Sequence, residues 1–210
     1  MVRKADTSRA RAERGDSKSK RTRTRILDAA AHVLSVQGFS GLRLQDVAAY
    51  AQLQAPGIYY HFSSREALIE EVMFCGISSL RRHLLQALCD LPPQTPSMGK
   101  ILVAVEAHLR HVLELSDYAT ASIRNAGQIP EHLRTRQKEE EAAYGRIWQQ
   151  LFTTAAAGGE IRDDINPEMA RFFVLGALNW AVEWWDPERD SIEAVVSTAQ
   201  ALVGKGLAPE

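Results

Sequence analysis

Residues 42–62 form the stretch that most limits how this chain can fold. They hold two short helical patterns, with too few residues between them for an ordinary helical hairpin. In the first pattern Leu44, Val47 and Ala48 stand at i, i+3 and i+4, which predicts an apolar stripe on a helix of about two turns. The second pattern has Pro56 in its first turn, where the missing N–H would have had no partner within the helix. The two patterns together predict a helix-turn-helix.

The second helix of this motif is expected to turn aromatic side chains outward. Ile58 and Phe62, four residues apart, can anchor it inward. Tyr59, Tyr60 and His61 then spread over the remaining surface. A helix with tyrosines exposed and small residues at its N-terminus suits the DNA major groove, where N-terminal residues meet base edges. The alternative is a short surface helix with ordinary aromatic packing.

The two ends of the chain differ strongly in charge, although the formal net charge is only −1. The first 25 residues hold ten Lys or Arg against three acidic residues, a charge of +7. The remainder holds 15 basic and 23 acidic residues, a charge of −8. A basic end on an acidic body predicts a polyanionic partner for that end alone. The alternative is a solvated leader without a partner.

Composition favours a globular protein. The chain has 210 residues, of which 45% are hydrophobic, enough for one or two compact domains with a core. An apolar run of about 18 residues and a cleavable leader are both missing, so we expect a cytoplasmic protein without a membrane partner. Cys75 and Cys89 fall inside apolar helical patterns, which favours reduced core thiols over a disulfide.

The chain divides into three segments. Residues 1–17 alternate charged with small residues and hold almost nothing to bury, so we expect a disordered basic arm that follows phosphates or enters a minor groove. Residues 18–65 are expected to form the helix-turn-helix domain, with a first helix from about Ser19 to Gly38. Residues 66–210 are expected to form a second domain.

The second domain is predicted to be helical throughout, since no stretch of it alternates like a strand. A capping box from Ser63 to Glu66 predicts the start of a helix of about 25 residues that ends near Cys89. Five further helices are expected near residues 98–115, 118–127, 131–157, 167–185 and 190–204.

Several short motifs keep a fixed spacing over residues 25–68. They are RILDAA at 25–30, GF at 38–39, DVA at 46–48, IYYHF at 58–62 and SREAL at 64–68. Together they resemble the N-terminal DNA-binding domain of the tetracycline-repressor (TetR) family.

Three residues depart from the family pattern. Leu42 stands where threonine is usual, Gln52 where glycine is usual in the turn, and Gln54 where serine usually caps the recognition helix. We expect Gln52 to take the turn conformation at a cost on the order of 1 kcal/mol. Gln54 is a weaker cap than serine, but its side chain can pair with adenine.

The resemblance implies a role for each matching residue of the motif. Two arginines would grip phosphates, the aromatic residues would contact backbone or thymine methyls, and the N-terminal residues of the recognition helix would face base edges. A structural hydrogen bond is the alternative for His61. The DNA-binding residues so implied are Arg43, Gln54, Ala55, Gly57, Tyr59, Tyr60, His61 and Arg65.

The helix expected at 167–185 is apolar nearly all round, so it must be buried on two sides. The resemblance implies that the last two helices form a four-helix interface with a second copy. A homodimer with twofold symmetry then presents two helix-turn-helix domains to a palindromic, double-stranded DNA operator. The interface residues expected are Phe172, Phe173, Gly176, Ala177, Trp180, Trp184, Val195 and Ala199.

The middle helices carry polar residues among apolar ones. In the family this region encloses a ligand pocket, whose occupation resets the fourth helix. GALNW at 176–180, EWWDP at 183–187 and GGEIRDDINP at 158–167 also resemble a subgroup tied to lipid and acyl-CoA metabolism. There Arg124 would meet a CoA phosphate or a carboxylate, with a surface ion pair as the alternative. The ligand-binding residues expected are His108, His111, Tyr118, Ser122, Arg124, Asn125, Tyr144, Trp148 and Asn179.

Catalysis and metal binding are not expected. His108 and His111 could form half of a metal site, but no Cys or carboxylate cluster accompanies them at ligand spacing. A nucleophile–base pattern, a Gly-rich phosphate loop and paired carboxylates are all missing, so we expect no enzyme and no cofactor.

The expected fold is all-α: an N-terminal three-helix helix-turn-helix domain and a C-terminal helical ligand-binding and dimerisation domain. The expected function is a transcriptional repressor, released from its operator by a small hydrophobic or acyl-CoA-like effector. The alternative is a helical ligand-binding protein or enzyme whose helix-turn-helix no longer reads DNA.

Overall fold

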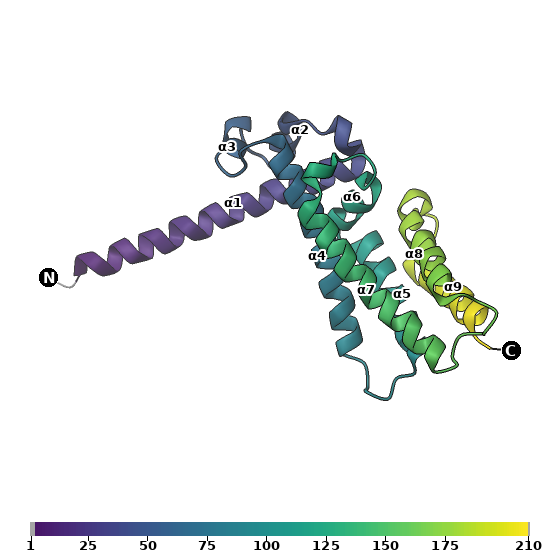
Figure 1. The fold of residues 1–210 in the computed structure, drawn as a ribbon. Coiled ribbons are helices and arrows are strands. Elements are labelled where there is room, and N and C mark those ends of the chain that lie inside the picture. The colour runs from purple at the N-terminus through teal and green to yellow at the C-terminus, as the bar shows by residue number, and fades with distance from the viewer. Residues whose placement is uncertain (1–2, 210) are drawn as a thin grey trace.

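The computed structural model describes residues 3–209, and for residues 3–17 it describes the backbone alone. No strand occurs within this range, which confirms the all-α fold class (Figure 1). The helices are α1 (Arg3–Gly41), α2 (Leu44–Tyr50), α3 (Ala55–Tyr59), α4 (Arg65–Cys89), α5 (Ser97–Arg110), a π-helical turn (His111–Leu115), α6 (Asp117–Asn125), a 3-10 turn (Glu131–Leu133), α7 (Thr135–Ala157), α8 (Pro167–Trp184) and α9 (Ile192–Leu207).

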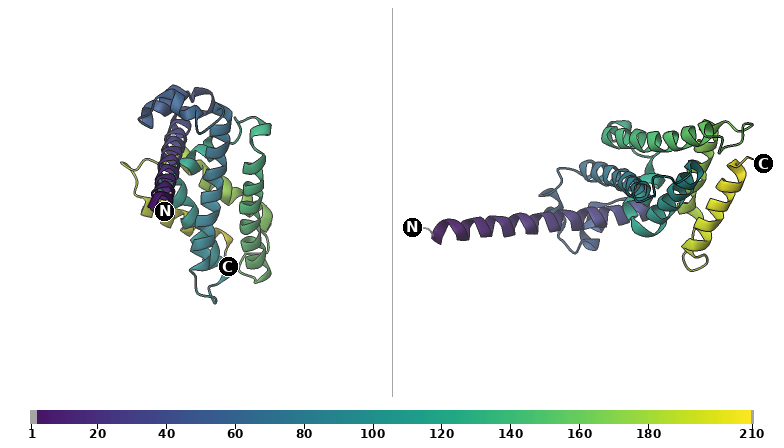
Figure 2. Two further views of the ribbon diagram at one scale, coloured as in Figure 1. Left: turned by 90° about the vertical axis from the view of Figure 1, so that its left-hand side faces the viewer. Right: turned by 90° about the horizontal axis from the view of Figure 1, so that it is seen from below.

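The head, which we define as α1 from residue 18 on, α2, α3 and the start of α4, lies at one end of the molecule. The body, which is the rest of α4 and the chain that follows it, extends from the head along α4 (Figures 1 and 2). The head core is built from the apolar stripes of its helices, including Ile26, Leu34, Val47, Ile58 and Leu68. These stripes match the spacing in the sequence, because residues three and four apart share a helix face.

Helix α1 continues to Arg3, where we expected disorder up to residue 17. Its N-terminal part projects away from the rest of the molecule (Figures 1 and 2). Arginine, alanine, glutamate and lysine are good helix formers, and extending an existing helix fixes only one residue per hydrogen bond. The contact of this arm with DNA stays a prediction.

The chain bends at Gly38, where we expected the first helix to end. Gly38 has φ +71°, a left-handed conformation that interrupts the helix between its two parts. Phe39 then packs against the head core, and the Leu42 amide donates to the Gly38 carbonyl at 3.1 Å. The bend therefore directs the chain into α2.

The turn between α2 and α3 has the expected left-handed residue. Gln52 has φ +53°, and in the described chain it is the only residue other than glycine with positive φ. The Arg25 guanidinium of α1 donates to the carbonyls of Ala51 and Gln52. A side chain of α1 thus holds the turn in place.

Helix α4 starts one residue later than the capping box predicted. Ser64, not Ser63, is the N-cap, and its side chain accepts a hydrogen bond from the Ala67 amide at 3.0 Å. The prediction was wrong because Ser64 has the extended backbone that an N-cap requires, which places Ala67 at the third helical position. The helix ends at Cys89, as expected.

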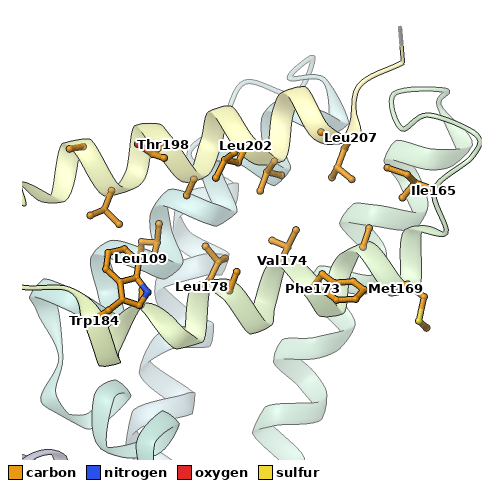
Figure 3. A pocket seen from close by; sticks show the side chains of 18 of the residues that line it. Leu109, Ile165, Met169, Phe173, Val174, Leu178, Trp184, Thr198, Leu202 and Leu207 are labelled. Carbon is orange, nitrogen blue, oxygen red and sulfur yellow. The ribbon is translucent and has the colours of Figure 1, made fainter.

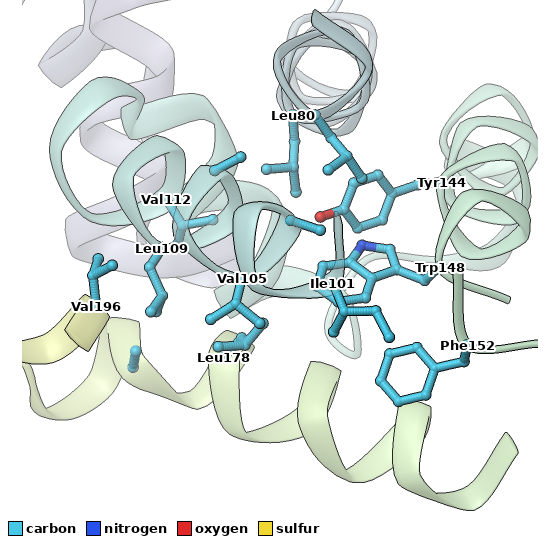
Figure 4. Close-up of a cluster of buried hydrophobic side chains, with 14 of the residues drawn as sticks. Leu80, Ile101, Val105, Leu109, Val112, Tyr144, Trp148, Phe152, Leu178 and Val196 are labelled. Atoms are coloured by element: carbon cyan, nitrogen blue, oxygen red, sulfur yellow. The ribbon is translucent and has the colours of Figure 1, made fainter. Parts of the chain in front are cut away.

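Helices α4 to α9 enclose the second core. Tyr144, Trp148 and Phe152 of α7 point into it against Ile101 of α5 and Leu80 of α4 (Figure 4). Both cysteines are free, as expected, but Cys89 is exposed and has no core role.

The head and the body also share apolar contacts. Ala121 of α6, together with Ile129 and Leu133 beyond it, is buried in the head core. The predicted boundary at residue 65 therefore coincides with the start of α4 and not with a gap in the packing.

Replacing Gly76 with alanine should loosen the packing of α4 against α6. A Cβ atom there would lie 2.3 Å from the Tyr118 carbonyl oxygen, so the two helices would have to separate. We expect the melting temperature to fall by an amount that corresponds to about 1–3 kcal/mol. Gly145→Ala is the matched control, because no atom lies within 4 Å of a Cβ there and alanine favours a helix. Equal melting temperatures for the two variants would contradict the close approach.

Replacing Gln52 with glycine should stabilise the protein by up to about 1 kcal/mol, because glycine adopts positive φ without steric cost. Chemical denaturation measures this difference. Gln52→Ala should bring no such gain, since alanine keeps the Cβ atom that causes the strain. A loss of stability in the glycine variant would show that the glutamine side chain itself supports the turn.

Candidate functional site

Helix α3 and the residues directly after it present aromatic side chains to solvent. Tyr60 is 82% exposed and Tyr59 is 58% exposed, whereas Ile58 and Phe62 are buried in the head core. His61 is half-buried and lies edge-on to the Tyr60 ring, with 5.0 Å between ring centroids. The expected division between anchoring and outward residues is therefore confirmed.

The start of α3 is open to solvent as well. Gln54 is the N-cap by its backbone, but its exposed side chain makes no capping hydrogen bond. Ala55 is half-buried. No atom of the described chain lies within 4 Å of the position that a Cβ on Gly57 would take. No neighbouring side chain in the protein therefore requires a glycine at this position. A second molecule that approaches the backbone closely would require one.

The two arginines predicted at phosphates lie in different surroundings. Arg43, the N-cap of α2, is exposed. The Arg65 Nε donates to the Leu42 carbonyl at 2.9 Å, and its Nη2 donates to the Phe39 carbonyl. Its guanidinium also lies 4.7 Å from the centre of the Phe39 ring. Arg65 therefore ties the start of α4 to the bend, and its phosphate contact stays a prediction.

Leu42, which stands where the family usually has threonine, is buried in the head core, so its side chain cannot contact a phosphate. Its side chain packs inward while its carbonyl accepts the Arg65 bond. The departure from the family at this position is accommodated by apolar packing.

Charged side chains join the head to the body across α4. Glu71 of α4 accepts hydrogen bonds from Arg23 of α1 at 2.9 Å and from Arg136 of α7 at 2.8 Å. Burial tends to raise the pKa of the Glu71 carboxyl, but the two arginines outweigh burial and the pKa lies below its ordinary value. The carboxylate therefore stays charged and bridges two helices that do not belong to the same domain.

Helix α6 is tied to α1 by a second set of contacts. The Tyr118 hydroxyl donates to Asp28 at 2.7 Å, and burial together with this partner raises the pKa of the tyrosine. Asn125, fully buried, accepts from the Phe39 amide at 2.7 Å and donates to the Leu34 carbonyl at 3.2 Å. Tyr118 and Asn125, both predicted to bind ligand, are thus engaged at the junction with the head.

Arg124 of α6 bonds to two other helices at once. Its Nε donates to Glu183 of α8 at 3.0 Å, and its Nη1 donates to the Ser35 carbonyl of α1 at 3.0 Å. Its Nη2 donates to the Val182 carbonyl, also in α8. The ion-pair alternative raised for Arg124 therefore holds, and the pair borders a cavity.

That cavity, of about 470 Å³, lies between α4, α6, α7 and α8. Four of the nine predicted ligand-binding residues line it: Ser122, Arg124, Tyr144 and Asn179. Residues that the sequence did not indicate line it as well: Ile77, Leu80, Glu141, Leu175 and Glu183. Their signal was present in part, because Leu80 belongs to the apolar stripe of α4 and Glu183 to the polar edge of an otherwise apolar α8.

His108 and Trp148 lie in the body core behind Tyr144 rather than in the cavity wall. The His108 ring nitrogen Nδ1 is 2.7 Å from the Tyr144 hydroxyl oxygen. Burial, with a contribution from His111, lowers the pKa of His108 to about 3, so the ring is neutral at physiological pH.

His111 packs on the other side, against α4. Its Nε2 is 3.0 Å from the Ser79 hydroxyl, and burial followed by repulsion from His83 and Arg82 lowers its pKa to about 4. Nowhere in the described part of the chain do three His, Cys, Asp or Glu side chains meet as a metal site would require. None of the helices in residues 3–209 has the length and apolarity of a membrane span.

Helices α8 and α9 leave an open apolar groove of about 860 Å³ between them (Figure 3). Five of the eight predicted interface residues line it: Phe173, Ala177, Trp184, Val195 and Ala199. Gly176 and Trp180 instead line the internal cavity. Phe172 is exposed beside the Arg171 guanidinium, which lies 4.1 Å from its ring centre. Helix α8 therefore contributes residues to two different spaces.

Two family descriptions match the chain. Residues 26–72 match the family described as bacterial regulatory proteins, tetR family. Residues 95–207, more than half of the chain, match the tetracyclin repressor-like C-terminal domain. The first match covers the head from residue 26 and ends within α4, and the second covers α5 to α9.

Curated relatives are similar over most of their length. The HTH-type transcriptional repressor KstR2 of Rhodococcus jostii (strain RHA1) is 24% identical over 193 residues, which cover 89% of this chain and 91% of the relative. The fatty acid metabolism regulator protein of Bacillus subtilis (strain 168) is 24% identical over 183 residues, which cover 85% and 92%.

Solved structures share the fold. AibR, crystallised in complex with isovaleryl coenzyme A and operator DNA, superposes with a TM-score of 0.78 at 20% identity, covering 86% of this chain and 97% of its own. The ketosteroid transcriptional regulator KstR2 of Mycobacterium tuberculosis gives 0.77 at 16% identity, covering 90% and 95%. With both family matches in sequence order, the chain belongs to the tetR family of bacterial regulatory proteins and is a DNA-binding transcriptional regulator.

Proposed function

We propose that this protein is a homodimeric repressor, that α2 and α3 bind its operator, and that a small amphipathic effector in the cavity between α4, α6, α7 and α8 releases it. The observation that carries the proposal is the outward face of α3. Two exposed tyrosines stand there beside Gly57, whose empty surroundings let a DNA edge approach the backbone closely.

The DNA contact is proposed to combine residues that recognise base edges with residues that bind the phosphate backbone. Gln54, Ala55 and Gly57 meet base edges, and Tyr59, Tyr60 and His61 meet backbone or thymine methyls. Arg43 is exposed at the start of α2 and supplies a phosphate contact. The basic arm adds further phosphate contacts, as its ten Lys or Arg within the first 25 residues favour.

The effector is proposed to be an amphipathic molecule with an apolar body. A volume of about 470 Å³ suits a small organic ligand, and the wall is apolar apart from a few polar groups that can orient it. Ser122, Tyr144 and Asn179 supply such groups. AibR was crystallised with isovaleryl coenzyme A, and the Bacillus subtilis relative is a fatty acid metabolism regulator protein; both support an acyl ligand.

Two copies are proposed to pair through α8 and α9. The groove between these helices is apolar, and Phe173 and Leu202 on its rim are 80% and 70% exposed. Exposed apolar surface of this extent marks an interaction site, and a twofold pair would bring two heads to one face of the DNA. A regulator that binds the chromosome acts in the bacterial cytoplasm, and relatives named as repressors support binding rather than catalysis.

Gly57→Leu should abolish close approach to DNA without harming the protein. The side chain has free space in the protein, so the melting temperature should not fall. Operator affinity should drop by about tenfold to a hundredfold, as expected when a base contact is lost. Gly127→Leu is the matched control, since a Cβ there also meets no atom and the residue lies outside the head.

Fluorescence anisotropy with an operator selected from random double-stranded DNA measures these affinities. Equal affinities for the two leucine variants would remove Gly57 from the interface. If the unaltered protein selects no sequence at all, the assignment as a DNA-reading repressor fails.

Ala177→Glu should convert the dimer to monomers, because a carboxylate in the apolar groove would lose its water when a second copy covers it. Sedimentation velocity measures the mass. Ala142→Glu, on an exposed part of α7, should leave the dimer intact. A dimer that survives the groove substitution would place the interface on other helices.

A further inference from the structure

The C-terminus of α6 holds both sides of the bend in α1. Arg124 bonds the Ser35 carbonyl before Gly38, and Asn125 bonds the Leu34 carbonyl before it and the Phe39 amide after it. Gly38 itself has φ +71° and sits between these contacts. We call this set of contacts the bend clamp. Two adjacent residues of the body thus fix the geometry of the chain as it passes into α2.

The two residues of the clamp differ in how readily they can move. Asn125 is fully buried, with all three of its partners inside the protein. The Arg124 side chain is 34% exposed, and its partner Glu183 is 39% exposed. Ion pairs with this degree of exposure are weak, because water and salt screen them. Arg124 is therefore the half of the clamp that a competing anion can reach.

The internal cavity brings such a competitor to Arg124. Arg124, Val182 and Glu183 all line it, so the ion pair is part of the cavity wall. The second carboxylate in the wall, Glu141, already accepts hydrogen bonds from Arg134 at 3.2 Å and from Gln137 at 2.6 Å. Arg124 is thus a cation in the cavity wall, and its carboxylate partner Glu183 is exposed enough to move into solvent.

We propose that Arg124 is the residue through which the effector acts, and that the effector carries a carboxylate or phosphate which replaces Glu183 on this guanidinium. A planar guanidinium binds such an oxyanion in a forked geometry, so it must turn toward the cavity to do so. Turning draws its Nη1 away from the Ser35 carbonyl and opens one side of the bend clamp. The bend in α1 then loosens, and α2 and α3 lose their fixed orientation.

This mechanism rests on the proposed effector cavity. It adds the chemistry of the effector's polar group and the contacts through which that group acts on the head of the protein. It predicts that a neutral molecule with the same apolar body would occupy the cavity without loosening the bend. Octanoate and 1-octanol form such a pair of probes, since they differ in the head group alone.

Hydrogen–deuterium exchange of the peptide covering residues 34–42 tests the mechanism without DNA. The amides of Phe39 and Leu42 are protected by clamp and bend contacts, so opening should accelerate their exchange. Octanoate should raise the exchange rate of this peptide in the unaltered protein by about tenfold, the size expected when a hydrogen bond to a charged group is lost. 1-Octanol should leave it unchanged.

Arg124→Gln should exchange rapidly in this peptide without any ligand, and octanoate should add nothing. Arg110→Gln is the matched control, because Arg110 also joins two helices through ion pairs but touches neither the cavity nor α1. It should respond to octanoate like the unaltered protein. Glu183→Gln removes the competing carboxylate, so it should respond at lower octanoate concentration.

Equal effects of octanoate and 1-octanol, or no effect of either, would overturn the mechanism, as would slow exchange in Arg124→Gln. Operator binding is measured separately on the same variants. If the protein shows the octanoate effect but binds no DNA, the proposed role of Arg124 stands and the repressor assignment is refuted.

Discussion

The close approach of α6 to α4 is the contact on which the rest of the structure depends. Gly76 leaves room for the Tyr118 carbonyl, so α6 can lie against α4 and reach α1 at the same time. Ala121 is then buried in the head core, while Ser122 on the same helix lines the cavity of the body. A ligand in the cavity and a residue of the head are therefore separated by a single helix.

Apolar and polar contacts contribute differently at this junction. Burial of apolar side chains supplies most of the free energy, because the hydrophobic effect scales with the area removed from water. The ion pairs of Glu71 and Arg124 are partly exposed and contribute little net stability, but they connect the head to the body through side chains that can exchange partners. A regulator needs this combination, since contacts that are weak in energy can be exchanged without unfolding the protein.

The sequence predicted the local features of the head well. Helical periodicity placed its helices, and it distinguished buried Ile58 from exposed Tyr60. The left-handed turn at Gln52 and the bend at Gly38 were also predicted correctly, because both follow from short-range backbone sterics. The cap of α4 was missed by one residue, since Ser63 and Ser64 both suit an N-cap and only the backbone conformation separates them.

The sequence predicted the candidate cavity less completely. Polar residues on apolar helices marked the correct region, but Tyr118 and Asn125 turned to the junction, whereas Tyr144 and Asn179 face the cavity. Helix α8 is apolar nearly all round in sequence, yet Phe173, Ala177 and Trp184 line the groove beside α9, whereas Gly176, Asn179 and Trp180 line the cavity.

The sequence by itself therefore determined the helices, the helix-turn-helix motif and the strained turn at Gln52. Each of these depends on residues within about one or two helical turns of one another. Only the tertiary structure decided which polar side chains line the cavity and which join the head to the body. That choice depends on how α6, α7 and α8 are rotated and spaced, which contacts between residues far apart in the chain fix.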